Sequence, residues 1–399
     1  MERRHEEIRI TEEMMRGLRN RVGIEVPHRG RPIVPEDSSI RFARGYGDLN
    51  PLYTDPEYGA KTRWGSLLTP PMFISHVGVS EKKQLTKEER ESGRGGALPG
   101  VHAFYSGDDI DFLQVIKPGD RISARSGLSG FVEKKSRFAG ETIHETHETV
   151  LRNQRGELVG VTRRLVIRAE RSMAQQAGKY ERSIQHYTKE EWEAIDADYE
   201  REEIRGANTR YWEDVNAGDE LTPVVKGPYT ATCFIAFAGG GGGGWLGAHS
   251  VQYEYRRRHP EAYPMTPYGF PDSVVRVHWE HEAARSAGLP LYYDYGGERI
   301  AWMAHLITHW MGDDGFLRKL DGQFRLFNYY GDTTWVKGKV TKKYVRDTTE
   351  HLVDIDISCV NQKGETHAPG HATVILPSRV HGPVVLPAKL DRPITFAFD

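Results

Sequence analysis

The chain has 399 residues, of which 38% are hydrophobic and 28% charged, and these values predict a globular protein of two domains, too long for one hydrophobic core. A net charge of −2 gives no bulk attraction to nucleic acid or to an anionic membrane, so neither is expected as a partner. A charged start without a signal-peptide core, no apolar run long enough to span a membrane, and only two cysteines, Cys233 and Cys359, favour a cytoplasmic protein without disulfides or a cysteine-rich metal site.

Paired landmarks in the two halves predict a duplicated module. Each half contains a Gly, then Phe-Ala at the same spacing, and later an Asn-Gln-basic-Gly-Glu turn in which Gly suits the positive φ of a tight hairpin. These landmarks are Gly23, Phe42-Ala43 and 153–157 in the first half, and Gly218, Phe237-Ala238 and 361–365 in the second. The preserved order predicts an N-terminal domain over 1–175, a linker over 176–214 and a C-terminal domain over 215–399.

The linker carries a charged stretch over 187–204 that is free of Gly and Pro, which predicts a helix packed on the outside. The second half then shows one long helix over 296–311, with an apolar stripe of Ile300, Met303, Ile307 and Trp310. Four strands are expected after it, over 323–332, 333–345, 351–361 and 367–376. One helix followed by an antiparallel sheet long enough to wrap around it predicts an α+β layer in each half.

Two further motifs carry a family resemblance. Residues 47–52 read Gly-Asp-Leu-Asn-Pro-Leu, and His278 is followed six residues later by Ala284. Together they resemble the signature of the MaoC-like, or hydratase 2 type, acyl-CoA hydratases and dehydratases in their double-hot-dog form, and the resemblance covers 20–170 and 215–378. It implies a tandem hot-dog fold, each half an antiparallel sheet around a central helix, and a coenzyme A thioester as substrate with no cofactor.

The resemblance also implies a site in the second copy. His278 would be the base that activates water, Asp272 the acid, and Gly296, at the helix start, the donor to the thioester oxygen. The family's acid position, five residues before the His, holds Ser273, and Asp272 is one residue further back. Expected substrate-binding residues are Tyr295, Gly297, Arg256 and Arg257.

The first copy departs from the pattern at two positions. Tyr53 occupies the position of the catalytic His, and Pro70-Pro71 fall where the donor should lie, although proline has no N–H. The first copy is therefore expected to be non-catalytic, with a short or broken helix that leaves room for a bulky acyl group or forms only a surface loop.

Other motifs are interpreted in simpler ways. The histidines of 278–282 and 305–309 invite a metal site, but neither run supplies a third ligand, so no metal is expected and His305 and His309 are expected to be exposed. The glycine run 239–244 is expected to be a flexible loop. His249 is the alternative base.

Three functions on this fold stay open. The first is interconversion of an enoyl-CoA and a 3-hydroxyacyl-CoA by a hydratase or dehydratase, with a bulky acyl group. The others are an acyl-CoA thioesterase and a non-catalytic acyl-CoA-binding subunit. A homodimer is possible.

Overall fold

Both halves contribute to one antiparallel sheet. The structure, a computed structural model, describes residues 9–136, 140–169, 182–242, 246–347 and 349–398. The strands of the first half are β1 (Glu25–Val26), β2 (His102–Phe112), β3 (Ser123–Ser136), β4 (Gly140–Arg152) and β5 (Leu158–Ala169). Those of the second half are β6 (Glu220–Lys226), β7 (Phe316–Gln323), β8 (Thr334–Arg346), β9 (Glu350–Asn361) and β10 (Thr366–Ile375).

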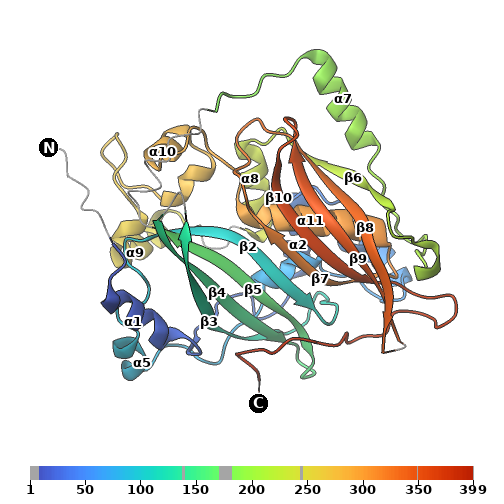
Figure 1. The fold of residues 1–399 in the computed structure, drawn as a ribbon, viewed down its shortest axis with the longest axis horizontal. Coiled ribbons are helices and arrows are strands. Elements are labelled where there is room, and N and C mark those ends of the chain that lie inside the picture. Colours follow the sequence, from blue (N-terminus) through green and yellow to red (C-terminus); the bar gives the residue numbers. More distant parts are fainter. Residues whose placement is uncertain (1–8, 137–139, 170–181, 243–245, 348, 399) are drawn as a thin grey trace.

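The strand order is β1-β3-β4-β5-β2-β7-β10-β9-β8-β6. Counted outward from the central pair β2–β7, corresponding strands of the two halves follow in the same order (Figure 1). The two halves join where β2 runs antiparallel to β7, with Ile110 opposite Leu320. The two halves thus form one continuous ten-stranded sheet and relate as the two subunits of a pseudo-dimer.

The hairpin turns give the duplication its most detailed support. In the first half the Asn153 side chain donates to Glu157 at 2.8 Å and Gln154 donates to Asp120 at 2.8 Å. In the second half Asn361 donates to Glu365 at 2.8 Å and Gln362 donates to Asp332 at 2.8 Å. The same side-chain bonds close the same turn in both copies.

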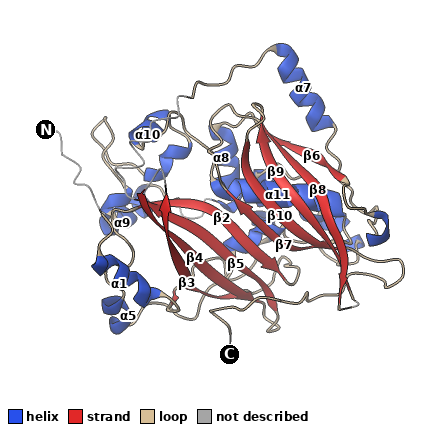
Figure 2. Cartoon of the chain, viewed as in Figure 1, coloured by secondary structure: helices blue, strands red, loops and turns tan. Residues whose placement is uncertain are grey.

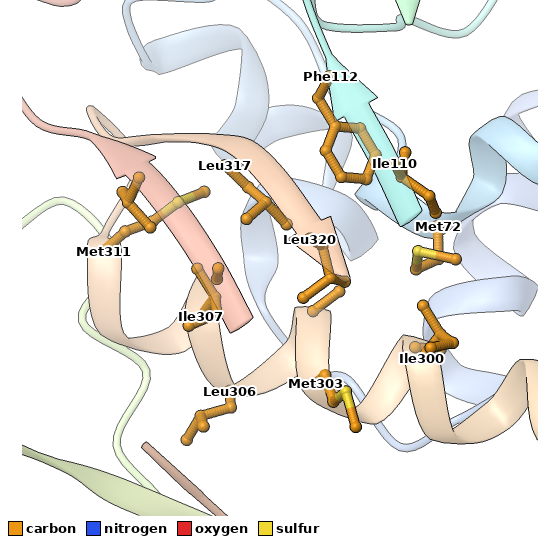
Figure 3. Close-up of a cluster of buried hydrophobic side chains, with 14 of the residues drawn as sticks. Met72, Ile110, Phe112, Ile300, Met303, Leu306, Ile307, Met311, Leu317 and Leu320 are labelled. Atoms are coloured by element: carbon orange, nitrogen blue, oxygen red, sulfur yellow. The ribbon is translucent and has the colours of Figure 1, made fainter. Parts of the chain in front are cut away.

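The central helix of the second half, α11 (Gly296–Met311), is buried from Glu298 to Met311. The predicted apolar stripe is buried, and so are the side chains between its members. Figure 3 shows Met303 and Ile307 in one cluster with Leu320 of β7 and Met72 of the first half. The helix therefore lies inside a core that both halves share.

The first copy has only a six-residue 3₁₀ helix, η1 (Pro71–His76), in the corresponding place. Its first residue is a proline, preceded by Pro70 in extended conformation. The short helix expected from the sequence is thus present, and its packing against α11 is direct.

The other helices lie in the same layer as α11 or at the edges of the sheet (Figure 2). They are α1 (Glu12–Arg21), α2 (Glu36–Gly45), α3 (Pro51–Thr54), α4 (Pro56–Lys61), α5 (Lys87–Ser92), η2 (Trp212–Asp214), α8 (Ala231–Phe237), α9 (His249–Arg258), η4 (Pro260–Ala262), η5 (Val274–His278) and α10 (His281–Ser286). The linker helix is α7 (Lys189–Glu200), which stands at the edge beside β6 (Figure 1). None of the helices in the described ranges combines the length and apolar character that a membrane span requires.

Two predictions need correction. The strand expected over 323–332 is wrong, because β7 covers Phe316–Gln323 and pairs there with β2 and β10. The glycine run is not a free loop in its described part, because residues 239–242 belong to the π-helical turn η3 (Ala238–Gly242). A Cβ on Gly240 would lie 2.6 Å from the Arg41 carbonyl oxygen of α2, so glycine allows this close packing.

The junction between the halves depends on Gly107. Its φ is +146°, and a Cβ there would lie 2.0 Å from the Gly322 carbonyl oxygen of β7. We predict that Gly107→Val lowers the free energy of unfolding by at least about 2 kcal/mol, because the side chain would force the strands apart and strain the backbone. Urea unfolding measures this.

The matched control is Gly130→Val on β3, where a Cβ meets nothing within 4 Å and the change should stay within about 1 kcal/mol. Equal stability of the two variants would show that the junction tolerates a side chain.

Candidate active site

His278 lies at the end of η5, between aromatic rings. Its ring stacks on Phe234 with centroids 5.7 Å apart, and it meets Tyr293 and Tyr295 edge-on at 4.7 and 5.5 Å. The Nδ1 atom is 3.0 Å from the Tyr293 carbonyl oxygen, so Nδ1–H donates there. In a neutral imidazole this leaves the lone pair on Nε2, the form that a general base requires.

Burial lowers the pKa of His278 to about 4, although the bonds to the Tyr293 and Asp294 backbone raise it in part. The residue keeps some contact with solvent, but its ring is largely enclosed by the three aromatic side chains. The ring is therefore neutral at physiological pH.

The start of α11 lies beside this histidine. Tyr295 is its N-cap residue and makes no side-chain capping bond, and Gly296 and Gly297 are the first helical residues. The first N–H groups of an uncapped helix are suited to an anionic oxygen. A Cβ on Gly296 would lie 2.6 Å from the Phe324 ring and 2.8 Å from the Tyr105 ring, so glycine is required where the first copy's β2 reaches over the helix.

The structure brings His278, Tyr295 and Gly296 together but leaves Asp272 apart. The Asp272 carboxylate accepts a bond from Ser273 N–H at 2.7 Å, at the turn that begins η5. In the described ranges no hydrogen bond or ion pair joins Asp272 to His278. Arg256 and Arg257 lie on α9, with their guanidinium groups over the Tyr253 ring.

Two buried carboxyl groups at the start of α11, those of Asp294 and Glu298, were not predicted from the sequence. Burial raises the pKa of Asp294 to about 6, against the effect of Arg299, whose Nε is 2.7 Å from Asp294 Oδ2. Burial and the Asp294 charge hold the pKa of Glu298 well above its usual value, and Tyr229 donates to Glu298 at 3.0 Å. An acidic residue on each side of Gly-Gly was visible in the sequence, but first-turn acids are common for helix-dipole reasons alone.

An apolar pocket lies at the other end of α11. It holds about 510 Å³ of space, mouth included, and its lining includes Tyr53, Ile74 of η1, Phe112 of β2 and Met311. With a rise of about 1.5 Å per residue, α11 separates this pocket from Gly296 by roughly 20 Å. The pocket is thus the first copy's counterpart of the site around His278, with Tyr53 in the position of the histidine.

A polar cluster in the core shows that the exposure predicted for His305 and His309 is wrong. His305 and His309 are buried, not exposed. The His305 Nε2 atom is 2.8 Å from His309 Nε2, and His309 Nε2 is 3.2 Å from Oδ1 of Asp48, in the Gly-Asp-x-Asn-Pro turn. Lys226 Nζ is 2.6 Å from His305 Nδ1, and burial lowers the pKa of Lys226 to about 8.

The two histidines of the motif at 278–282 lie against different side chains. The His281 ring stacks on Tyr292 at 4.5 Å and meets Tyr330 at 5.2 Å, whereas His278 contacts a different set of rings. His249, the alternative base, is exposed at the start of α9.

Comparisons with known proteins support the same fold. A family model described as the FAS1-like dehydratase domain region matches residues 20–162. The chain is similar to a probable enoyl-CoA hydratase alpha subunit of Thermomonospora curvata, 24% identical over 149 residues, which is 36% of this chain and 47% of that protein. The match thus spans about half the length of this relative.

Solved structures cover nearly the whole chain. A MaoC-like dehydratase superposes with a TM-score of 0.60 at 16% identity, covering 90% of this chain and 99% of that one. A MaoC domain protein dehydratase from Chloroflexus aurantiacus gives a TM-score of 0.55 at 14% identity, with coverages of 90% and 96%. The likeness confirms the tandem hot-dog fold expected from the sequence.

The buried imidazole of His278 should make stability depend on pH. The unfolded chain binds a proton on this residue near pH 6.5, and the folded chain only near pH 4. Between these values the unfolded state binds more protons, so the free energy of unfolding falls as pH falls, by up to about 3 kcal/mol from this group.

We predict that His278→Gln loses less stability than the unmodified protein between pH 6.5 and 4, as measured by urea unfolding at each pH. The exposed residue His249 provides the control, and His249→Gln should follow the unmodified protein. Identical pH slopes in all three proteins would mean that the His278 ring is not buried as a neutral group.

Proposed function

We propose that this chain, of the MaoC-like hot-dog family, is a hydratase or dehydratase that interconverts an enoyl-CoA and a 3-hydroxyacyl-CoA. The observation that supports it most is the position of His278, oriented by Tyr293 beside the uncapped start of α11. The name of the Thermomonospora curvata relative points to the same reaction.

In this proposal His278 Nε2 takes a proton from water as the water adds to the β-carbon of the enoyl thioester. The first N–H groups of α11, at Gly296 and Gly297, donate to the thioester oxygen, where negative charge develops. Tyr295 lies against His278 and would bound the substrate on that side. These residues come from one short segment and the helix that follows it, which fixes their mutual positions.

The proton for the α-carbon needs a protonated acid. The family resemblance implies this role for Asp272, whose carboxylate accepts a hydrogen bond from the Ser273 N–H. Glu298 is a second candidate, because burial and the Asp294 charge raise its pKa and so favour the protonated form relative to an exposed carboxyl group. Asp272→Asn and Glu298→Gln, compared by kcat, separate the two roles.

We propose that a bulky or long acyl part extends to the apolar pocket beside η1, where the first copy lacks a full helix. Because the pocket lies roughly 20 Å from Gly296, only a long acyl chain would reach it. The substrate panel should therefore include thioesters of increasing chain length. We propose that the CoA part meets Arg256 and Arg257 of α9. The homodimer expected from the sequence stays a prediction.

We predict that His278→Ala reduces kcat by about 10²–10⁴-fold while KM changes little, because the base acts in the chemical step. The assay follows loss of enoyl-thioester absorbance with a panel of CoA esters, and free thiol is monitored in parallel. His249→Ala, the matched control, should retain activity.

Full activity in His278→Ala would remove this residue from the mechanism. Release of CoA without a hydroxyacyl product would identify a thioesterase instead. Binding of acyl-CoA without turnover of any ester would identify a non-catalytic acyl-binding subunit.

The first copy gives a separate prediction. Tyr53→His should not create a second active centre, because Pro70 and Pro71 still provide no N–H at the start of η1. We expect no activity from Tyr53→His in a His278→Ala background, measured with the same assay. Activity at a level near that of the unmodified protein would place the oxyanion donor elsewhere in the first copy.

A further inference from the structure

We propose that Asp48, His305 and His309 form a binding site for one divalent transition-metal ion, best suited to Zn²⁺, that clamps the first copy's Gly-Asp-x-Asn-Pro turn to α11. The three residues are fully or almost fully buried, and the hydratase proposal uses none of them. His305 and His309 are one helical turn apart on the same face. Asp48 supplies the third ligand that neither histidine motif contains.

The geometry of the three ligand atoms fits a single ion. The His305 Nε2–His309 Nε2 distance is 2.8 Å, the His309 Nε2–Asp48 Oδ1 distance is 3.2 Å and the His305 Nε2–Asp48 Oδ1 distance is 3.6 Å. A triangle with these sides has a circumscribed radius of about 1.9 Å, so a point about 2.0–2.1 Å from all three atoms exists, which is the usual Zn²⁺–N and Zn²⁺–O distance. The three ligand atoms lie within 4.8 Å of one another, and a fourth ligand would complete the tetrahedron that Zn²⁺ prefers.

The hydrogen-bonding alternative is less complete. If Lys226 donates to His305 Nδ1, then His305 carries its proton on Nε2 and donates it to His309 Nε2. His309 Nε2 then carries no proton to donate to the Asp48 carboxylate at 3.2 Å, so two acceptors lie against each other. A cation at the common point satisfies all three lone pairs at once.

Further contacts hold Asp48 and His305 in place, as outer-shell partners of metal sites do. The Asn50 N–H donates to Asp48 Oδ1 at 2.9 Å, and the Tyr46 hydroxyl donates to Oδ2 at 3.2 Å. Lys226 Nζ lies 2.6 Å from His305 Nδ1 and donates to the Tyr46 carbonyl oxygen at 2.9 Å.

The choice of ion follows from the donor set. Two imidazoles and one carboxylate suit Zn²⁺ and other late first-row ions, whereas Mg²⁺ and Ca²⁺ require mostly oxygen ligands. The site joins the turn over 47–53 to a helix of the other half, so the ion would stabilise the contact between the two copies.

The test uses the full chain. The protein is treated with a chelator, dialysed against excess Zn²⁺ or Co²⁺, passed over a desalting column and assayed by metal analysis. We expect one ion per chain, a tetrahedral Co²⁺ absorption spectrum and a higher unfolding temperature with metal than without. His309→Gln and Asp48→Asn should weaken binding more than about 100-fold, beyond the usual cost of losing an outer-shell partner.

The matched control is His351→Gln, which removes one member of another histidine pair, whose Nε2 is 3.0 Å from His381 Nδ1. This variant should bind as the unmodified protein does. Two results would overturn the proposal and leave the cluster as a hydrogen-bonded relay. One is only trace metal after reconstitution, and the other is metal binding by Asp48→Asn and His309→Gln as tight as that of the unmodified protein.

If a ligand variant fails to fold, X-ray absorption of the unmodified Zn²⁺ protein decides the question. Nitrogen and oxygen neighbours with two imidazoles support the proposal, and a thiolate signal refutes it. Metal content is measured without substrate, so failure of the hydratase assay does not affect this result.

Discussion

The burial of α11 on every side is the constraint on which the rest of the molecule depends. One half of a hot-dog pair can shield only part of a central helix, and here η1 and β2 of the first copy complete the enclosure with β7 of the second. Because the helix has no solvent face, each polar group on it must find a partner inside the protein. In the first turn Arg299 pairs with Asp294 and Glu298 accepts from Tyr229, and in the third and fourth turns His305 and His309 lie beside Asp48.

The duplication kept the frame of the module and changed its centre. The hairpin turns at 153–157 and 361–365 are closed by the same bonds, whereas the helices they surround differ in length from six to 16 residues. A short helix that begins with a proline lacks the first N–H donor, and an apolar pocket lies beside it. A long helix that begins with two glycines offers donors and fills the core. The same fold thus places a cavity at one end of α11 and polar groups at the other.

Local features of the sequence predicted much of this arrangement. The repeat, the long helix and the last three strands depend on turn chemistry and periodicity, which a single sequence carries. The strand expected over 323–332 was misplaced because that segment is rich in aromatic residues, whereas the strand that forms, Phe316–Gln323, carries three charged residues. At the junction this strand pairs with β2 through Gly107 opposite Gln323 and Asp108 opposite Gly322. His305 and His309 looked exposed because they lie off the apolar stripe. Only the tertiary structure shows that the first copy covers that face.

Asp48 illustrates how position rather than residue type determines chemistry. A carboxylate in a hydrophobic core costs several kcal/mol unless it is paired and hydrogen-bonded, and Asp48 is fully buried. In the first copy the residue five positions later is Tyr53, which cannot act as the base that the signature histidine would be. The carboxylate is instead satisfied by Asn50, Tyr46 and the histidines of α11. A motif that resembles half of a catalytic pair therefore contributes to holding the copies together, while the site proposed for catalysis lies at the other end of the same helix.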